Sequence, residues 1–198
     1  MKVVVFIDVQ NDFVDGALPV DKDHETTKKI GKYAYVCKCE HIPLIATRDT
    51  HSDADHDFTE FDDTLYYDET LEGKNLAIPH CIYKTHGWEL ADELKDYVPE
   101  TNIVDKTTFG SIEDLVARIH IINDSFEETF DEKIDEIEIC GYCGSICVVS
   151  NALILRAAFP NTKITLLKNL CADVDEESFN ATLKVLHNCM IDVRDAIV

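Results

Sequence analysis

Short apolar runs alternate with amphipathic helical segments along most of this chain, and this alternation restricts the folds that it can adopt. Val3–Ile7 is an apolar, β-branched run, as expected for a strand buried on both faces of a sheet. Residues 25–39 follow with apolar side chains at helical spacing, and residues 43–47 form a second short strand. Because strands that alternate with helices build βαβ units, we expect a parallel sheet.

The same alternation continues to the end of the chain. Further strands are predicted at residues 102–105, 137–140, 163–167 and 190–194, the last of them edge-like. Further helices are predicted at residues 146–158, at 176–186 and at 111–121, where Ile112, Leu115, Val116 and Ile119 share one face. The predicted fold class is α/β: one domain over residues 1–198, with three α-β-α layers around a mostly parallel six-stranded sheet.

The composition argues against several classes of partner. A formal net charge of −21 disfavours nucleic acid and anionic membranes, since both are bound by patches of Lys and Arg. No segment approaches the ~20 apolar residues of a membrane helix. The N-terminal apolar run ends at Asp8 without a small-residue cleavage site, so we expect a cytoplasmic protein. Its eight cysteines are then expected to be reduced thiols.

Three chemically complementary residues follow three different strands. Asp8 ends the first strand, Lys106 the third, and Cys147 lies where a helix begins after the fourth. Sites in open parallel sheets form at the carboxyl ends of the strands, so these side chains should meet. The helix dipole and Lys106 would lower the pKa of Cys147, and Asp8 would act as base and then as acid. Taken singly, the cysteine could be a buried hydrophobe and the other two an ion pair.

A second group of candidates falls in residues 48–100, a long polar insertion that interrupts the alternation and is expected to carry active-site residues. It contains Asp49, His51 and His56, and later His80. A carboxylate with two or three imidazoles suits Zn²⁺, with Fe²⁺ or Mn²⁺ as alternatives. Asp49 and His51 lie two residues apart, on one side of an extended segment. The alternative is a set of exposed loop histidines, above all for His56.

Ordered motifs over nearly the whole chain carry a family resemblance. They are FIDVQNDF at 6–13, TRDTH at 47–51, IPHCIYKTHGWEL at 78–90, DKTTFGS at 105–111 and CGYCGSICV at 140–148. With these motifs the chain resembles the nicotinamidase branch of the isochorismatase-like cysteine hydrolases. The resemblance implies the α/β fold of that superfamily and a catalytic triad of Asp8, Lys106 and Cys147. It also implies that a divalent metal is bound, and its ligands are Asp49, His51, His80 and, in some members, the counterpart of His56.

The resemblance also implies how the substrate is held. The oxyanion hole would use the backbone N–H groups of Cys143 and Cys147, next to a cis peptide bond between Tyr142 and Cys143. Phe13 and Tyr142 would line the substrate pocket. The reaction implied is hydrolysis of nicotinamide to nicotinate and ammonia through a cysteine thioester. The small-molecule amide is then the main partner, and the apolar helix at 146–158 together with the family's habit predicts a homo-oligomer.

Three alternatives remain open at this point. Gly144-Ser145 stands where relatives often have Thr-Asp, which leaves room for an isochorismatase-type or other small-amide cysteine hydrolase. Cys140-Gly-Tyr-Cys143 also matches the C-x-x-C pattern of thiol–disulfide oxidoreductases, although that reading leaves Asp8 and Lys106 unexplained. The third alternative is a binding protein that has kept the fold without catalysis.

Overall fold

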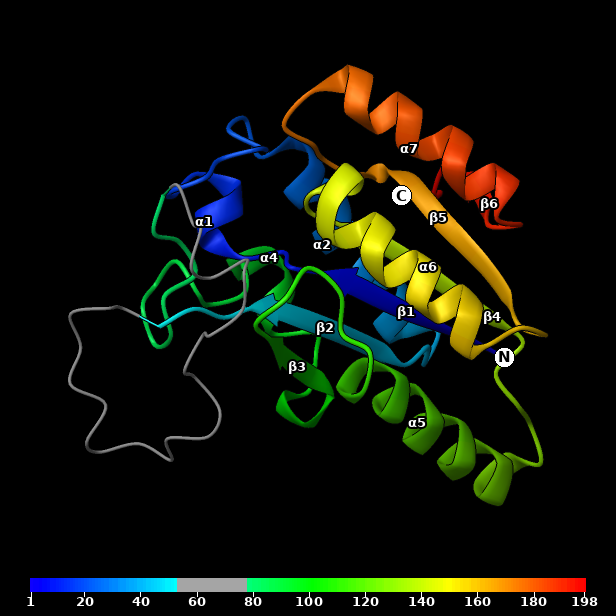
Figure 1. Ribbon diagram of the computed structural model, residues 1–198. Helices are drawn as coiled ribbons and strands as arrows, with labels where there is room; N and C mark the ends of the chain where they lie inside the picture. The colour runs from blue at the N-terminus through cyan, green and yellow to red at the C-terminus, as the bar shows by residue number, and fades with distance from the viewer. Residues whose placement is uncertain (53–77) are drawn as a thin grey trace.

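A computed structural model describes residues 1–52 and 78–198 of the chain. Its six strands form one sheet in which every neighbouring pair is parallel, in the order β3-β2-β1-β4-β5-β6 (Figure 1). The strands are β1 (Lys2–Ile7), β2 (Leu44–Asp49), β3 (Ile103–Lys106), β4 (Glu136–Gly141), β5 (Lys163–Cys171) and β6 (Asp192–Arg194). The predicted α/β fold with a parallel six-stranded sheet is confirmed.

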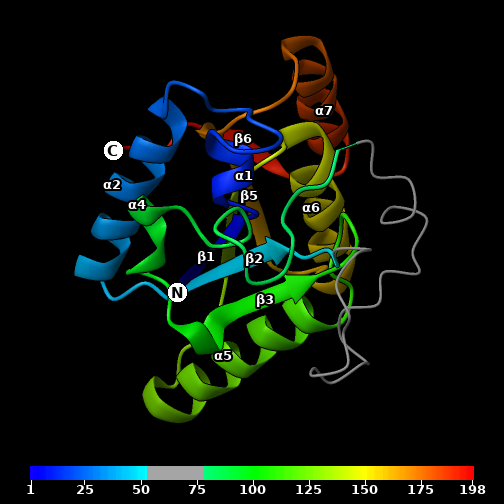
Figure 2. The same cartoon turned by 90° about the vertical axis from the view of Figure 1, so that its left-hand side faces the viewer.

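Helices cover both faces of this sheet, which gives the three predicted layers. Figure 2 shows α2 and α4 on one side of the strands and α6 and α7 on the other. The helices are α1 (Asn11–Val14), α2 (Glu25–Cys39), α4 (Asp92–Lys95), α5 (Asp114–Phe130), α6 (Val149–Ala158) and α7 (Glu176–Asn188). Two further helical turns are the 3-10 helix η1 (Glu100–Asn102) and the π-helical turn η2 (Gly144–Val148). Within the described ranges, no helix has both the length and the apolar character of a membrane span.

The core lies between the sheet and these helices. Every residue from Val3 to Ile7 in β1 is fully buried, as expected for a central strand of a parallel sheet covered on both faces. The chain leaves β1 toward β2 on one side and reaches β4 on the other, so the strand order reverses at β1. Such a reversal opens a crevice at the carboxyl ends of the two strands, which is where ligands bind in open α/β sheets.

Helix α5 differs from the sequence prediction at both ends, since it continues to Phe130 rather than to residue 121 and also starts later than expected. We expected Ile112 on the buried face of a helix from residue 111, but α5 begins at Asp114 and Ile112 is 72% exposed. Ser111 explains the delay, because its N–H donates to Asn151 Oδ1 of α6 at 2.9 Å and its hydroxyl accepts from the N–H of Leu115 at 3.2 Å. The residues before Asp114 are thus tied to α6 rather than wound into α5.

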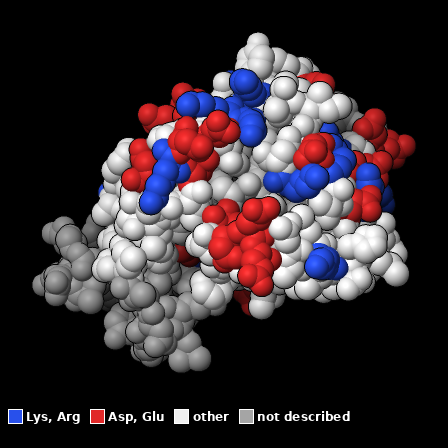
Figure 3. Space-filling model, turned by 90° about the horizontal axis from the view of Figure 1, so that it is seen from above, with Lys and Arg blue, Asp and Glu red and all other residues white. Residues whose placement is uncertain are grey.

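Charged side chains of both signs are spread over the face of the molecule seen from above. On the face shown in Figure 3, Asp and Glu side chains form several groups, and Lys and Arg side chains lie among them rather than in one broad area.

The environment of Asp21 predicts how the unfolding free energy of the protein changes as the pH falls. Burial raises the pKa of its carboxyl, but hydrogen bonds from Thr27, Thr26 and Tyr142 outweigh that effect and lower it below 3.8. A carboxyl with a lowered folded-state pKa stabilises the protein above pH 3.8, and this contribution is lost as the pH falls through the folded-state value. Asp21→Asn should therefore cost roughly 1–3 kcal/mol at neutral pH.

Urea unfolding at pH 7 and at pH 2–3 tests this expectation. The difference in unfolding free energy between wild type and Asp21→Asn should narrow at the lower pH. Asp23→Asn is the matched control, because Asp23 is exposed and its carboxylate accepts one hydrogen bond, from the N–H of Glu25. A difference that stays constant between the two pH values would show that the charge of Asp21 has no such role.

Candidate active site

The predicted catalytic residues meet at the carboxyl ends of the central strands. Asp8 follows β1, while Asp49 and Lys106 end β2 and β3 and are paired in the sheet register. Cys147 lies in η2, directly after β4 and the turn that follows it. All four side chains are buried, with 0 to 5% of each residue exposed. Asp8, Lys106 and Cys147, which the sequence places after three different strands, thus meet at one edge of the sheet.

The Lys106 ammonium lies at the centre of this group. Its Nζ is 2.7 Å from Asp8 Oδ2, 3.2 Å from Asp49 Oδ1 and 3.8 Å from Cys147 Sγ. Burial lowers the pKa of Lys106, but the two carboxylates and the Cys147 sulfur outweigh it and raise the pKa well above 10.5. Lys106 is therefore charged, and its charge is shared between two acidic partners and the sulfur.

The Cys147 thiol corrects one sequence expectation. We expected the helix dipole and Lys106 to lower its pKa, but the pKa is raised well above 9.0. Burial is the largest cause; Lys106 opposes it, and the carboxylates of Asp8 and Asp49 add to it. In the protein alone, Cys147 is a protonated thiol, so a base must remove its proton before the sulfur can attack.

Asp8 has the environment of such a base. Its backbone takes a positive φ of 50°, and its N–H donates to Thr47 Oγ1 at 3.1 Å while the Thr47 hydroxyl donates back to Asp8 Oδ1 at 2.6 Å. Burial raises the pKa of Asp8, Lys106 opposes this rise, and Asp49 adds to it. A carboxyl whose pKa is raised above its ordinary value holds a proton more readily, which suits a group that must accept a proton and later return it.

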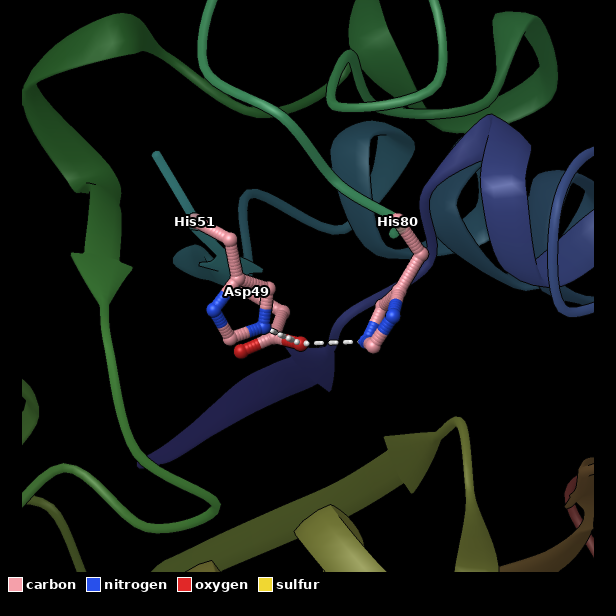
Figure 4. A group of neighbouring side chains, drawn as sticks. All are labelled: Asp49, His51 and His80. Carbon is pink, nitrogen blue, oxygen red and sulfur yellow. Dashed lines mark hydrogen bonds and ion pairs between the residues drawn. The ribbon is translucent and has the colours of Figure 1, made fainter. Parts of the chain in front are cut away.

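Asp49, His51 and His80 form a compact group beside the triad (Figure 4). One ligand atom from each residue lies within 4.8 Å of the others, and all three residues are buried. The Nε2 atoms of His51 and His80 lie 2.9 and 3.3 Å from the same oxygen, Asp49 Oδ2. His80 Nδ1 is 2.8 Å from the carbonyl oxygen of Ile78, which assigns the proton to Nδ1 and leaves the Nε2 lone pair toward Asp49.

This donor set fits a divalent metal of the zinc type, because it offers one carboxylate and two imidazoles oriented by their neighbours. It is the set that the sequence predicted. The remaining candidate, His56, lies outside the described residues.

Two polar residues that the sequence motif contained without an assigned role hold these ligands in place. Gln10 is fully buried, and its side-chain amide makes two bonds to the backbone of Asp49, accepting from its N–H at 2.7 Å and donating to its carbonyl at 2.8 Å. Asp12 Oδ2 accepts from the N–H of Cys81 at 2.6 Å, next to His80. The available signal was the presence of polar side chains right after an apolar strand.

The turn before Cys147 has the form expected of an oxyanion hole. The peptide bond between Tyr142 and Cys143 is cis, as the family resemblance implied. The amide N–H groups that follow are bonded to protein oxygens, at Gly144, Ser145, Ile146 and Val148. Within residues 1–52 and 78–198, the N–H of Cys143 has no hydrogen-bond partner. Most N–H groups of the turn are therefore bonded within the protein, and the N–H of Cys143 is left to bind another acceptor.

The two aromatic residues assigned to the substrate pocket differ in position. Phe13 lies beside the metal-binding group, with its ring 5.5 Å from that of His80 in an edge-on contact. Tyr142 is fully buried, and its hydroxyl lies 2.7 Å from Thr27 Oγ1 and donates to Asp21 Oδ2 at 3.1 Å. The prediction that the Tyr142 side chain lines the pocket is therefore wrong, because this side chain packs under α2.

The C-x-x-C pair lacks the chemistry of a redox site. Cys140 is fully buried in β4, and burial raises the pKa of its thiol well above 9.0. Burial also raises the pKa of Cys143 to about 12, with a further contribution from Asp173. Thiol–disulfide exchange needs an accessible cysteine of lowered pKa, so these two thiols do not fit that alternative.

Replacing Lys106 should destabilise the protein. Lys106→Met would leave the buried carboxylates of Asp8 and Asp49 without their cation, which costs roughly 3–5 kcal/mol. Urea unfolding at neutral pH measures the loss. Lys133→Met is the matched control, because Lys133 pairs with Glu127 at the surface and its removal should change little. Equal unfolding free energies for the two variants would contradict the central role of Lys106.

Comparisons with known proteins give this geometry a context. Solved structures that share the fold include a pyrazinamidase from Pyrococcus horikoshii in complex with zinc, a nicotinamidase/pyrazinamidase from Bacillus subtilis and an N-carbamoylsarcosine amidase from Thermoplasma acidophilum. The first is 21% identical, with a TM-score of 0.73 and coverage of 98% of this chain and 99% of that chain. The second is 22% identical, with a TM-score of 0.72 and coverage of 98% and 99%. The third is 16% identical, with a TM-score of 0.71 and coverage of 98% and 95%.

The sequence itself carries the family assignment. A comparison with curated proteins found no match. The family model for the isochorismatase domain matches residues 2–197, which is nearly the whole chain. The chain therefore belongs to the isochorismatase domain family.

Proposed function

We propose that this protein is a nicotinamidase-like amidohydrolase, which converts nicotinamide and water to nicotinate and ammonia through a thioester on Cys147. The observation that carries the proposal is the buried cluster in which Lys106 Nζ contacts Asp8, Asp49 and Cys147. Nicotinamidases and pyrazinamidases among the structural neighbours support it. The reaction would place the protein in cytoplasmic pyridine nucleotide salvage.

The first half of the reaction forms the thioester. Asp8 takes the proton of the Cys147 thiol, and Lys106 stabilises the thiolate with its positive charge. The sulfur then attacks the carboxamide carbon, a C–S bond forms, and the carbonyl electron pair moves onto oxygen. The N–H of Cys143, with that of Cys147, faces this oxyanion, a stabilisation of roughly 3–4 kcal/mol per donor where measured.

Collapse of the resulting tetrahedral oxyanion completes the first half, and hydrolysis of the thioester is the second half. The oxyanion electron pair returns to carbon, the C–N bond breaks, and Asp8 returns its proton to the leaving nitrogen, so that ammonia departs. Asp8 then takes a proton from water, and the hydroxide adds to the thioester carbon. When the C–S bond breaks, the sulfur recovers the proton from Asp8 and the acid is released. Asp8 thus carries one proton in each direction during each half-reaction.

Asp49, His51 and His80 would hold the divalent metal. When bound, a metal ion such as Zn²⁺, or Fe²⁺ or Mn²⁺, would supply a Lewis acid that orients the substrate through its ring nitrogen or a water. Phe13 lies against His80 and offers an aromatic surface beside this position. Lys106 links the metal-binding group to the catalytic triad, because its Nζ contacts Asp49 Oδ1 as well as Asp8 and Cys147.

Cys147→Ala tests the nucleophile. An ammonia-release screen over nicotinamide, pyrazinamide and carbamoyl amides should detect turnover in wild type and at most about one part in ten thousand in the variant. Cys143→Ala is the matched control, since the proposal uses only the backbone of that residue, and it should retain most activity. Full activity of Cys147→Ala would exclude the mechanism, whereas activity on carbamoyl amides alone would correct the substrate.

Removal of His80 tests the metal site. Purified wild type, loaded with Zn²⁺ and desalted, should carry about one ion per chain by elemental analysis, and His80→Ala should bind Zn²⁺ at least tenfold more weakly in a competition titration with a chromophoric chelator. His86→Ala is the control, because His86 is an exposed histidine of the same segment. If both variants bound Zn²⁺ as wild type does, the three residues would not be the metal site.

A further inference from the structure

The segment after β5 runs alongside the turn that carries the oxyanion donors. β5 ends at Cys171, and the next residue pairs with the turn through its backbone in both directions. Ala172 N donates to the carbonyl oxygen of Gly141 at 3.4 Å, and Gly144 N donates to the carbonyl oxygen of Ala172 at 3.0 Å. The turn is therefore held from one side by a segment 28 residues further along the chain.

Asp173 completes this attachment with its side chain. Its carboxylate accepts both donors of Ser145, the backbone N–H at Oδ2 and the hydroxyl at Oδ1, the latter at 2.8 Å. Oδ1 also accepts from the N–H of Val174 at 2.7 Å, which fixes the carboxylate relative to its own backbone. Charged acceptors make hydrogen bonds about twice as strong as neutral ones, so Ser145 is held firmly.

The packing around Gly144 leaves the turn no room to move toward this segment. A β-carbon on Gly144 would lie 2.5 Å from the Phe179 ring and 3.0 Å from Asp173 Oδ2. Phe179 belongs to α7, and the carboxylate of Asp175 caps that helix by accepting from Ser178 N at 2.8 Å. The pair Gly144-Ser145 is thus matched to residues of this chain's own β5–α7 segment.

We propose that Asp173 is a positioning residue for the reaction. Through Ser145 it fixes the turn from Cys143 to Cys147, and so sets where the free N–H of Cys143 lies relative to the Cys147 sulfur. Asp173 itself touches no reacting atom. The inference rests on the proposed function, in which that N–H meets the oxyanion. A displacement of about 1 Å at such a donor can cost about a hundredfold in rate.

Three variants test the inference in the full-length protein. Asp173→Ala removes both bonds to Ser145, and Asp173→Asn keeps an oxygen for the Ser145 N–H without the charge. Asp175→Ala is the matched control, because Asp175 also accepts an N–H and a hydroxyl, both from Ser178, but has no bond to the turn. The readouts are kcat and KM for nicotinamide and, independently of activity, hydrogen–deuterium exchange of peptides covering residues 141–150.

For Asp173→Ala we expect kcat to fall about tenfold or more, with KM within about threefold, and exchange in residues 141–150 to accelerate. Asp173→Asn should recover kcat to within about threefold of wild type. Asp175→Ala should change neither kcat nor exchange in the turn, although it weakens α7. This pattern would separate a positioning role from general destabilisation of the β5–α7 segment.

Several results would overturn the inference. Unchanged hydrogen–deuterium exchange of residues 141–150 in Asp173→Ala would show that Asp173 does not fix the turn. Faster exchange with unchanged kcat would show that fixing the turn does not contribute to the reaction. Equal losses in Asp173→Ala and Asp175→Ala would indicate a merely structural effect. If Asp173→Ala does not fold, Ser145→Ala removes the hydroxyl bond alone and should show the same pattern to a smaller extent. Wild type that releases ammonia from no amide would refute the proposed function, and with it the positioning role.

Discussion

The buried ion cluster around Lys106 is the interaction on which the rest of the site depends. One ammonium lies within 3.2 Å of two carboxylates that come from different strands, and it also contacts the Cys147 sulfur. Each of these charges would be costly to bury alone, so each strand end needs the others. The cluster therefore ties the ends of β1, β2 and β3 and the turn after β4 to one geometry, and that geometry is what the proposed chemistry uses.

Hydrogen bonds from uncharged side chains surround this charged centre and set its geometry. Thr47 bonds both the backbone and the carboxylate of Asp8, and the buried amide of Gln10 fixes the backbone of Asp49. The fixed position of Asp49 also orients the metal-binding group, since Asp49 Oδ1 faces Lys106 while Oδ2 faces both histidines. The proton-transfer and metal-binding halves of the site are thereby coupled through a single carboxylate.

The sequence predicted the architecture and the meeting of Asp8, Lys106 and Cys147 because both follow from local patterns. Apolar runs alternating with helices imply parallel strands, and the carboxyl ends of parallel strands share one edge. The raised pKa of Cys147 could not be predicted, since it depends on burial and on distances to Asp8 and Asp49. The contacts of Tyr142 and Asp173 could not be predicted either, because their partners lie far away in the sequence and are brought close only by the packed fold.

Trapping the covalent intermediate tests the central claim most directly. Wild-type protein mixed with nicotinamide, quenched in acid within milliseconds to seconds and digested, would be examined by mass spectrometry for a nicotinoyl thioester. The account predicts this adduct on the peptide that contains Cys147 and on no other cysteine, with a population that decays as nicotinate appears. Release of ammonia and nicotinate with no adduct at any quench time, and at the same rate in Cys147→Ser, would contradict it.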